Sequence, residues 1–406
     1  MHMTMTDRQK ELVDLAGWLG REKFAARAAD YDREARFPFE NYDDLREHGF
    51  LALCIPQQYG GLGADYQTYM LVAAEIGRHC GATALTFNMH SCSMLWSGPL
   101  ADDLEMTTEQ RDRHEERRAG IFRRVVEDKA LFAQPFSEPN TSAAAGKAPF
   151  GTTARKTDGG WLVNGKKHFA SLSGAANYYG VLCTEDREGA DLDAKDTLYL
   201  AVPGDAAGFE ITGTWDTLGM RATVSRSLNM QDVFVPDELQ IMPRGIYYKA
   251  ALTWPHMFMT LTPSYMGIAH AAYDFVVRYL RGEVKGGPPG KRRSSPTKQM
   301  FVAEMKIKLE QAEALFLRAI AEAKVNPTKQ ERMRAYAAQY TIMEYANDIC
   351  QLAIRTCGGS TIMKALPLER LYRDSRCGAL MLPWTAEACL ERIGREALYE
   401  PGERDD

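Results

Sequence analysis

Apolar residues recur at every third or fourth position in the last third of the chain, which is the spacing of one face of a helix. Three such stripes cover residues 261–279, 302–319 and 335–356. Gly358 and Gly359 follow the third stripe, as glycine commonly does where a helix ends. Stripes this regular predict long helices packed side by side in a bundle.

The middle of the chain has a period of two, which is typical of strands. Residues 179–183, 197–202 and 232–235 show it. Ahead of them, residues 161–163 are aromatic or branched and lie between Asp158-Gly159 and Asn164-Gly165, two dipeptides that tolerate the positive φ angles of tight hairpins. We therefore expect a small β-sheet here, with a hairpin turn at each dipeptide.

The first third returns to helical spacing, so the predicted fold class is α+β. We expect an N-terminal α-helical domain over residues 1–130, a middle antiparallel β-domain over 131–245 and a C-terminal four-helix-bundle domain over 246–406. A sheet between two helical blocks has a helical layer on either side. Ligands tend to bind where such layers meet, so we expect the functional site at this junction.

Composition excludes several classes of function. The chain has 406 residues, 45% of them hydrophobic, and a formal charge of −5, which favours neither nucleic acid nor an anionic membrane as a partner. No apolar run is long enough to span a bilayer, and the N-terminus lacks the apolar core of a signal peptide. The eight cysteines form no CxxC pair, so we expect no metal site, reduced thiols and a cytoplasmic protein.

Five short motifs follow one another in a recognisable order. They are IPQQYGGLG, the pair of Phe136-Ser137-Glu138-Pro139 with DGGWLVNGKKHFAS, WDTLGMRAT, DVFVPDE, and Cys357-Gly358-Gly359 with LPLERLYRDSR. In this order and at compatible spacing they resemble the signatures of the acyl-CoA dehydrogenases. The resemblance covers nearly the whole chain, and each motif alone would be weak.

The resemblance implies a flavoprotein that binds FAD and assembles as a homotetramer or homodimer. It implies α,β-dehydrogenation of an acyl-CoA or acyl-carrier thioester, with an electron-transfer flavoprotein as acceptor. By the match, Ser137 and Ser171 supply hydroxyl groups to the flavin, Phe169 packs on its ring, and the segment from Gln134 to Phe136 supplies backbone beside it. Such donors stabilise the negative charge of a reduced flavin.

Other residues are assigned to the cofactor by the same resemblance. Gly358 and Gly359 would let the diphosphate or adenine of a neighbouring subunit's FAD approach the backbone, Arg355 could donate to phosphate, and Thr385 belongs to the same site. The family's second phosphate clamp, Arg-x-x-Phe-Gly, is absent, and Arg292 or Arg293 could substitute for it.

The catalytic base departs most clearly from the family pattern. Removing the α-proton of a thioester needs a carboxylate whose pKa an apolar pocket raises. Leu382 occupies the position of that glutamate, and the alternative family position falls near Met257, beside His256. His256 could act as the base, or Glu387 could reach in, or the reaction needs no such base.

Three functions therefore remain open. The first is an FAD-dependent acyl-thioester dehydrogenase with a non-standard or relocated base. The second is a flavin-dependent monooxygenase on the same scaffold, in which reduced flavin meets oxygen and no α-proton is removed. The third is an acyl-CoA-binding flavoprotein without turnover.

Overall fold

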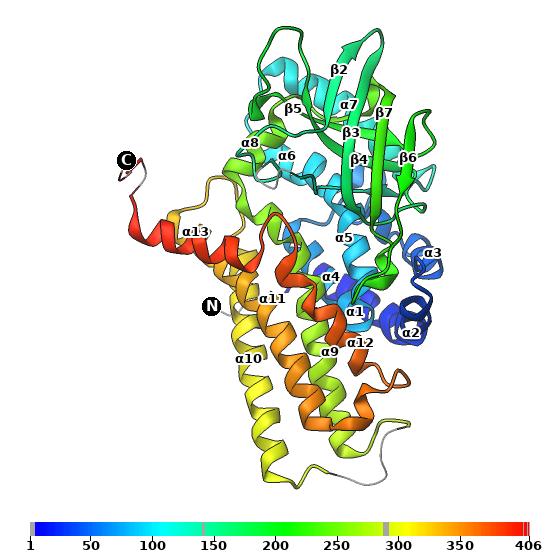
Figure 1. Ribbon diagram of the computed structural model, residues 1–406, viewed down its shortest axis with the longest axis vertical. Helices are drawn as coiled ribbons and strands as arrows, with labels where there is room; N and C mark the ends of the chain where they lie inside the picture. The colour runs from blue at the N-terminus through cyan, green and yellow to red at the C-terminus, as the bar shows by residue number, and fades with distance from the viewer. Residues whose placement is uncertain (1–4, 140–142, 287–291, 401, 404, 406) are drawn as a thin grey trace.

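Helices, a sheet and more helices follow one another along the chain in this computed structural model (Figure 1). The structure describes residues 5–139, 143–286, 292–400, 402–403 and 405. The sheet occupies one end of the molecule, and the long C-terminal helices extend from it towards the other end (Figure 1).

Three of the N-terminal helices, α1, α4 and α7, begin at polar caps. Thr6 and Thr107 each form a capping box with the glutamine three residues on, and the Asp65 side chain accepts from the backbone N–H of Thr68. These helices are α1 (Asp7–Leu19), α2 (Ala25–Glu34), α3 (Phe39–Glu47), α4 (Tyr66–His79), α5 (Gly81–Leu95), α6 (Ala101–Asp103) and α7 (Thr108–Val126).

Among the described residues the sheet has eight strands, and most of their pairings are antiparallel, as expected. Along the sheet the order is β6-β7-β3-β2-β4-β5-β8, and β1 pairs with β4. The β1–β4 and β2–β4 pairings are parallel. The strands are β1 (Phe132–Ala133), β2 (Thr153–Thr157), β3 (Gly160–Ala170), β4 (Tyr178–Glu185), β5 (Thr197–Pro203), β6 (Phe209–Thr212), β7 (Arg226–Pro236) and β8 (Gln240–Met242). The sequence pattern did not indicate β1, β6 or β8.

The two glycine dipeptides have different roles. Asp158-Gly159 is a hairpin turn, as expected, because it joins the antiparallel strands β2 and β3. Asn164-Gly165 is not a turn, and that prediction was wrong. It lies within β3, at a bulge in the pairing with β7, where the side-chain amide of Asn164 donates to the Asp232 carboxylate at 2.9 Å. Gly165 is required there, because a Cβ atom would lie 2.7 Å from the Thr152 Cα.

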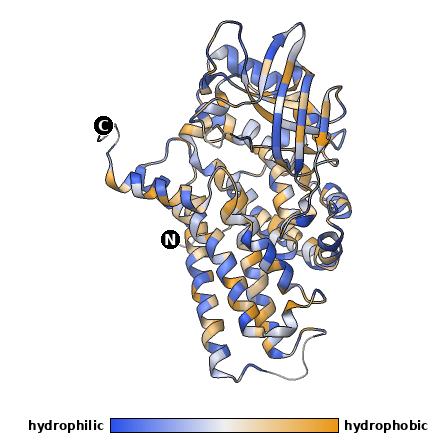
Figure 2. Ribbon diagram, in the orientation of Figure 1, coloured by the Kyte–Doolittle hydropathy of each residue, from blue (hydrophilic) through white to orange (hydrophobic). Residues whose placement is uncertain are grey.

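The C-terminal helices follow the three predicted stripes. Helices α9, α10 and α11 cover them, and α12 packs against α9 and α11. Hydrophobic and hydrophilic residues alternate along these helices (Figure 2), as expected where each helix buries one face. The helices of this part are α8 (Ile246–Thr253), α9 (Thr262–Arg281), α10 (Pro296–Ala321), α11 (Lys329–Cys357), α12 (Leu368–Arg376) and α13 (Ala386–Leu398).

Helix α5 is the centre of the molecule. All 15 of its residues are buried, because it contacts α4, β1, α9 and α12. Some of its polar side chains find partners in neighbouring layers, as Ser93 does at Tyr199. His90 accepts a hydrogen bond from the backbone N–H of Phe132, and its other ring nitrogen bonds the Leu51 carbonyl at 2.7 Å. His90 is therefore a hydrogen-bonded core residue.

None of the helices in the described ranges combines the length and the apolar character needed to cross a membrane.

Candidate functional site

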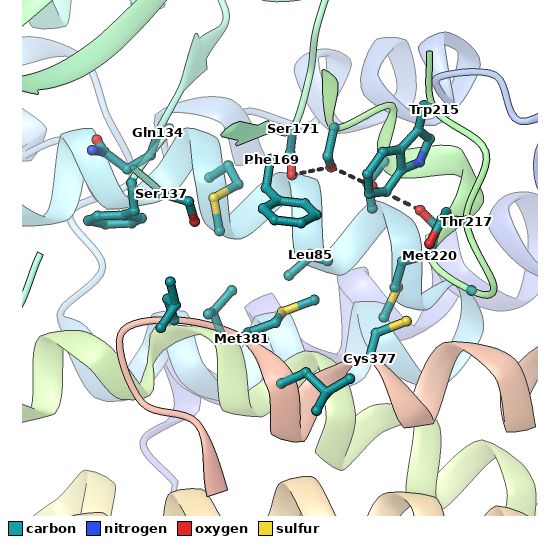
Figure 3. A pocket seen from close by; sticks show the side chains of 18 residues that line it. Leu85, Gln134, Ser137, Phe169, Ser171, Trp215, Thr217, Met220, Cys377 and Met381 are labelled. Atoms are coloured by element: carbon teal, nitrogen blue, oxygen red, sulfur yellow. Dashed lines mark hydrogen bonds between the residues drawn. The ribbon is translucent and has the colours of Figure 1, made fainter. Parts of the chain in front are cut away.

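A cavity of about 310 Å³ lies where the sheet meets the helices (Figure 3). Its walls come from several separate parts of the chain, among them the segment from Trp215 to Ser225. Gln134, Phe136 and Ser137 follow β1, Phe169 and Ser171 stand at the end of β3, and α5 together with the segment after α12 closes the opposite side. Its volume is at the lower end of the range typical of small-molecule sites.

The wall from the sheet is polar. Gln134 is buried and fixed on both sides, because its amide nitrogen donates to the Gly180 carbonyl at 2.9 Å and its oxygen accepts from the Tyr199 hydroxyl. Ser137 pairs through its backbone carbonyl with the N–H of His168 at 2.8 Å. This bridge holds the segment after β1 against β3, so residues predicted for one site lie together.

Three buried hydroxyl groups form a chain along this wall. The Ser171 and Ser225 hydroxyls are 2.7 Å apart, as are those of Ser225 and Thr223, and the Thr223 hydroxyl donates to the Met220 carbonyl at 2.8 Å. The backbone supports the arrangement, because Leu172 N–H donates to the Thr223 carbonyl. Thus two segments about fifty residues apart in sequence present their hydroxyls to one cavity.

The backbone at the rim of the cavity is strained. Phe169, Leu172, Met220 and Val224 all have φ between +45° and +66°. This left-handed region is unfavourable for bulky side chains and above all for a β-branched one such as valine. The Phe169 ring is 65% exposed and stands edge-on to the Trp215 ring at 6.2 Å. Such strain is typical of sites where function fixes the backbone.

The opposite wall is apolar. It is made by Leu85, Met89, Leu261, Leu380, Met381 and Leu382. Among the described residues that line the cavity there is no carboxylate, imidazole, lysine or arginine. Cys377 also lines it, but burial raises the pKa of its thiol to about 11, so it carries no charge near neutral pH.

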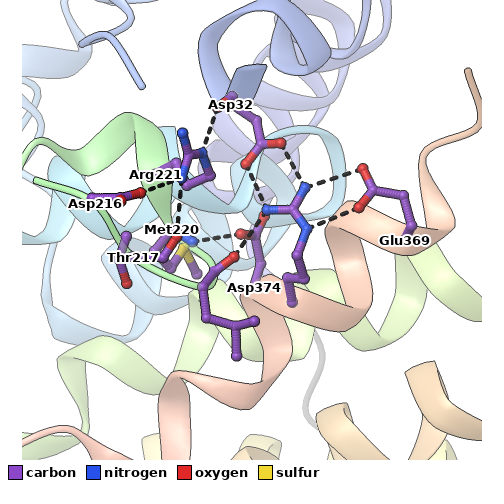
Figure 4. Close-up of polar contacts among 9 residues, drawn as sticks. Asp32, Asp216, Thr217, Met220, Arg221, Glu369 and Asp374 are labelled. Atoms are coloured by element: carbon purple, nitrogen blue, oxygen red, sulfur yellow. Dashed lines mark hydrogen bonds and ion pairs between the residues drawn. The ribbon is translucent and has the colours of Figure 1, made fainter. Parts of the chain in front are cut away.

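A polar clamp joins the two walls (Figure 4). The buried carboxylate of Asp374 in α12 accepts from the Met220 N–H at 2.6 Å, and Arg373 donates to the Leu218 carbonyl at 3.0 Å. Arg373 also pairs with Asp32 and Glu369. The fit at Gly219 is close, because a Cβ atom there would lie 2.2 Å from the Arg373 carbonyl oxygen.

A buried ion pair supports the polar wall from behind. The Lys167 ammonium donates to Glu138 at 2.5 Å and to the Leu182 carbonyl at 2.6 Å, and both side chains of the pair are nearly inaccessible. Burial by itself would raise the pKa of Glu138. However, Lys167 and the N–H groups of Gly151 and Thr152 hold that pKa below its usual value.

Neither proposed base lies among the residues that line the cavity. His256 is fully buried in the 3₁₀ helix Pro255–Leu261, and its two ring nitrogens have no hydrogen-bond partner among the described residues. Burial lowers its pKa to about 4. Glu387 is exposed in the first turn of α13. Leu382, which the sequence resemblance assigns to the position of the family base, does line the cavity.

The remaining cofactor residues lie elsewhere. Gly358 ends α11 with a φ of 89°, and at both Gly358 and Gly359 the space that a Cβ would occupy is open. The Arg355 guanidinium is exposed and lies over the Phe301 ring at 5.1 Å. The Thr385 hydroxyl caps α13 by accepting from the Ala388 N–H at 3.2 Å. These groups are not part of the cavity within one chain.

Sequence reasoning assigned no role to Trp215, Met220, Thr223, Ser225 or Asp374. The first three belong to the stretch WDTLGMRAT, so the motif itself was the available signal. Motif spacing did not reveal which of its residues face a cavity.

Comparison with known proteins places the chain in a family. Models described as the N-terminal, middle and C-terminal domains of acyl-CoA dehydrogenase match residues 6–113, 133–233 and 259–381. The chain belongs to the acyl-CoA dehydrogenase family. It is therefore an oxidoreductase that uses a flavin, and its order of helical, sheet and helical parts is the fold of that family.

Individual relatives include proteins of different activity. The mitochondrial short-chain specific acyl-CoA dehydrogenase of Mus musculus is 30% identical over 86% of this chain and 80% of its own length. The butyryl-CoA dehydrogenase structure from Megasphaera elsdenii superposes with a TM-score of 0.79 at 23% identity, covering 97% of this chain and 99% of that one. The dibenzothiophene monooxygenase TdsC from Paenibacillus sp. A11-2 gives 0.78 at 21% identity, over 96% and 97%. The two structural likenesses concern the fold.

Proposed function

We propose that this protein is a flavin-dependent monooxygenase that acts on an apolar substrate. The observation that carries the proposal is the lining of the cavity: hydroxyl and amide groups on one wall, aliphatic side chains on the other, and no carboxylate or imidazole among the described lining residues. A reaction that begins by removing an α-proton needs a base at this place. A reaction in which reduced flavin meets oxygen does not.

The alternative bases are poorly suited to rescue a dehydrogenase. Losing a general base costs about 10²- to 10⁴-fold in rate. His256 has a pKa of about 4, so it is a weak base, and its ring is enclosed outside the cavity lining. Glu387 is exposed on α13. A monooxygenase needs no base at Leu382, so neither His256 nor Glu387 has to move into the cavity.

The residues fit a flavin ring in the cavity. Ser137, Ser171 and the backbone from Gln134 to Phe136 would face its polar edge, and Phe169 with Trp215 would cover the ring. When bound in reduced form, the flavin supplies the two electrons for oxygen activation. The aliphatic wall orients an apolar substrate and excludes water, which protects a reactive reduced cofactor from unproductive reactions.

We further propose FAD as the cofactor of an enzyme that assembles as a homotetramer or homodimer in the cytoplasm. The open backbone at Gly358 and Gly359 and the exposed Arg355 would receive the diphosphate or adenine of a neighbouring subunit's FAD, and we propose Thr385 as a further contact of the cofactor. With the Arg-x-x-Phe-Gly clamp missing, Arg292 or Arg293 would complete the phosphate contacts.

A second candidate is an acyl-thioester dehydrogenase that passes electrons to an electron-transfer flavoprotein. The mouse relative, 30% identical, supports it. This function requires a base that the described lining of the cavity does not supply.

An anaerobic experiment separates the candidates. The flavin-loaded protein is mixed with a panel of acyl-CoAs while the flavin absorbance is followed. It is then reduced chemically and exposed to oxygen with and without apolar compounds, and products are analysed by mass spectrometry. We expect no bleaching by acyl-CoA and one added oxygen atom in a product. Bleaching by an acyl-CoA would contradict the proposal in favour of a dehydrogenase. A spectral shift without either reaction would indicate a binding protein.

A further inference from the structure

The chain of hydroxyls from Ser171 through Ser225 to Thr223 has only one fixed end. At its inner end Thr223 meets the Met220 carbonyl, which accepts hydrogen bonds and cannot donate them. At its outer end the Ser171 hydroxyl lines the cavity and has no partner among the described residues other than Ser225. The three side chains are buried, so water does not compete freely for their protons.

Each hydroxyl donates only one hydrogen bond, so the hydrogen bonds along this row of hydroxyls can point in either of two directions. In the inward direction Ser171 donates to Ser225, Ser225 to Thr223, and Thr223 to the Met220 carbonyl. Ser171 then offers only lone pairs to the cavity. In the outward direction Thr223 donates to Ser225, Ser225 to Ser171, and Ser171 offers its proton to the cavity.

Reversing the direction of these hydrogen bonds costs little free energy. The Met220 carbonyl also accepts from the Thr223 backbone N–H at 3.1 Å, so it stays hydrogen-bonded when the Thr223 hydroxyl turns away. One neutral hydrogen bond is given up at the inner end, worth about 1 kcal/mol, and one is made in the cavity. What occupies the cavity therefore decides the direction.

We propose that Thr223, Ser225 and Ser171 form a reversible hydrogen-bond relay that matches Ser171 to the oxidation state of the flavin. Nitrogen N5 of an oxidised flavin has a lone pair and accepts a hydrogen bond, whereas N5 of the reduced flavin carries a hydrogen and donates one. The outward direction serves the oxidised cofactor and the inward direction serves the reduced one. This inference rests on the flavin lying against Ser171, as in the proposed function.

The surroundings keep the relay in place while its protons reorient. The Met220 N–H is held by Asp374 at 2.6 Å, so the inner end of the relay is anchored by the clamp of Figure 4. The N–H groups of Leu172 and Ser173 donate to the carbonyls of Thr223 and Val224, each at 3.1 Å, which fixes the outer end against the inner one. Only hydroxyl rotations are needed to change direction.

The experiment compares the affinity for FAD in its two oxidation states. FAD is titrated aerobically in oxidised form and anaerobically in dithionite-reduced form. Each titration uses the full-length parent protein and the variants Thr223→Val, Thr223→Ser and Ser173→Ala. Thr223→Val keeps the shape of the side chain but removes the acceptor that the inward direction needs. We expect it to raise the Kd for reduced FAD about 5- to 10-fold, the loss of one hydrogen bond, and to change the Kd for oxidised FAD less than about twofold.

The controls separate the relay from packing. Thr223→Ser keeps the hydroxyl and should restore the original ratio of the two Kd values. Ser173 is buried nearby, but its hydroxyl donates to the Ala170 carbonyl and is outside the relay, so Ser173→Ala should leave the ratio unchanged. Ser225→Ala interrupts the relay at another point and should weaken reduced FAD in the same sense if Thr223→Val fails to fold.

An unchanged ratio in both Thr223→Val and Ser225→Ala, with normal FAD binding by the parent chain, would overturn the relay and leave the proposed function standing. A parent chain that binds FAD in neither oxidation state would overturn both.

Discussion

The carboxylate of Asp374 accepts a hydrogen bond from the backbone N–H of Met220 at 2.6 Å, and this contact connects the two walls of the cavity. Asp374 lies in α12, which leads into Cys377 and the apolar segment from Leu380 to Leu382, while Met220 belongs to the opposite, hydroxyl-bearing wall. The hydrogen bonds from Met220 to Asp374 and from Arg373 to Leu218 therefore help to hold the two walls together.

Two replacements of Asp374 should separate its role as hydrogen-bond acceptor for Met220 from the effect of its ionisation. Asp374→Ala leaves the Met220 N–H buried without an acceptor, which should lower the free energy of unfolding by about 1–3 kcal/mol. Asp374→Asn keeps an oxygen at the same place. Burial raises the pKa of Asp374 to about 6, although Arg370 and Arg373 favour its charge and Asp32 opposes it.

The effect of ionisation is measured by comparing how the stability of the parent protein and of Asp374→Asn depends on pH. Between pH 4 and pH 6 folded Asp374 retains a proton that the unfolded chain has released, so its contribution to stability falls as pH rises through this window. Urea unfolding at pH 4.5 and pH 7 should show Asp374→Asn gaining roughly 2 kcal/mol relative to the parent chain at the higher pH. A constant difference between the two proteins would contradict the raised pKa.

Lys167→Met should be among the most damaging substitutions outside the cavity. It leaves the buried carboxylate of Glu138 without its cation, and breaking a buried ion pair in this way typically costs about 3–5 kcal/mol. Because Glu138 and Lys167 hold together the two segments of the polar wall, flavin affinity should fall as well. Lys166→Met is the matched control, since Lys166 is adjacent but exposed. Equal effects of the two changes in urea unfolding would show that the pair is unimportant.

Leu382→Glu should introduce a base at the position that the sequence resemblance assigns to the family's glutamate. In an apolar surrounding the new carboxylate should have a raised pKa, which suits proton abstraction near neutral pH. We expect bleaching of the flavin by acyl-CoA to become measurable, at least about tenfold faster than in the parent chain. Leu382→Gln has nearly the same size and no proton-accepting charge, so it should remain inactive. Stopped-flow absorbance under anaerobic conditions provides the rates, and equal rates in both variants would exclude a base function at this position.

His256 and His90 form a second matched pair of variants. Burial lowers the pKa of both to about 4, but His90 bonds Leu51 and Phe132, whereas the His256 ring has no partner among the described residues. His90→Phe should therefore destabilise the protein by about 2 kcal/mol or more at pH 7, and His256→Phe should be neutral or stabilising.

The same low pKa fixes the sign of a pH effect. Between pH 4 and pH 6.5 the unfolded chain binds a proton at His256 that the folded chain does not, so stability rises with pH through this window and is lost on acidification. His256→Phe should remove about 2 kcal/mol of the loss between pH 7 and pH 5. Urea midpoints at the two pH values test this. A variant that keeps the full acid sensitivity would show that His256 is not neutral in the folded protein.

The sequence predicted the long C-terminal helices α9, α10 and α11 well because each buries one face against neighbours, which leaves a periodic stripe. It was less reliable where a strand is paired on both sides. Asp158-Gly159 and Asn164-Gly165 carry the same turn signal, but only the first dipeptide stands at a strand end. At the second, β7 continues alongside β3 and converts the dipeptide into a bulge. Tertiary pairing decided between the two outcomes, and the local sequence could not.

The part of the candidate site that lies in local sequence motifs was predictable, whereas contacts between distant segments were not. Gln134, Phe136, Ser137, Phe169 and Ser171 were found because their motifs are local in sequence, and they line one cavity. The partnership of Ser171 with Ser225 and Thr223 was not found, because it depends on two distant segments meeting with backbones in rare conformations. The sequence placed Leu382 where the resemblance expects a base, and Leu382 does line the cavity. The enclosure of His256 was not predictable from the sequence.

The complete burial of helix α5 limits which fragments of the chain can fold on their own. Because all 15 of its residues are buried against several parts of the protein, among them β1 and the C-terminal helices α9 and α12, a shortened chain that omits the sheet or these helices would expose part of it to water. Fragments made by cutting between these parts should aggregate rather than fold, so the enzyme is one cooperative unit despite its three-part layout.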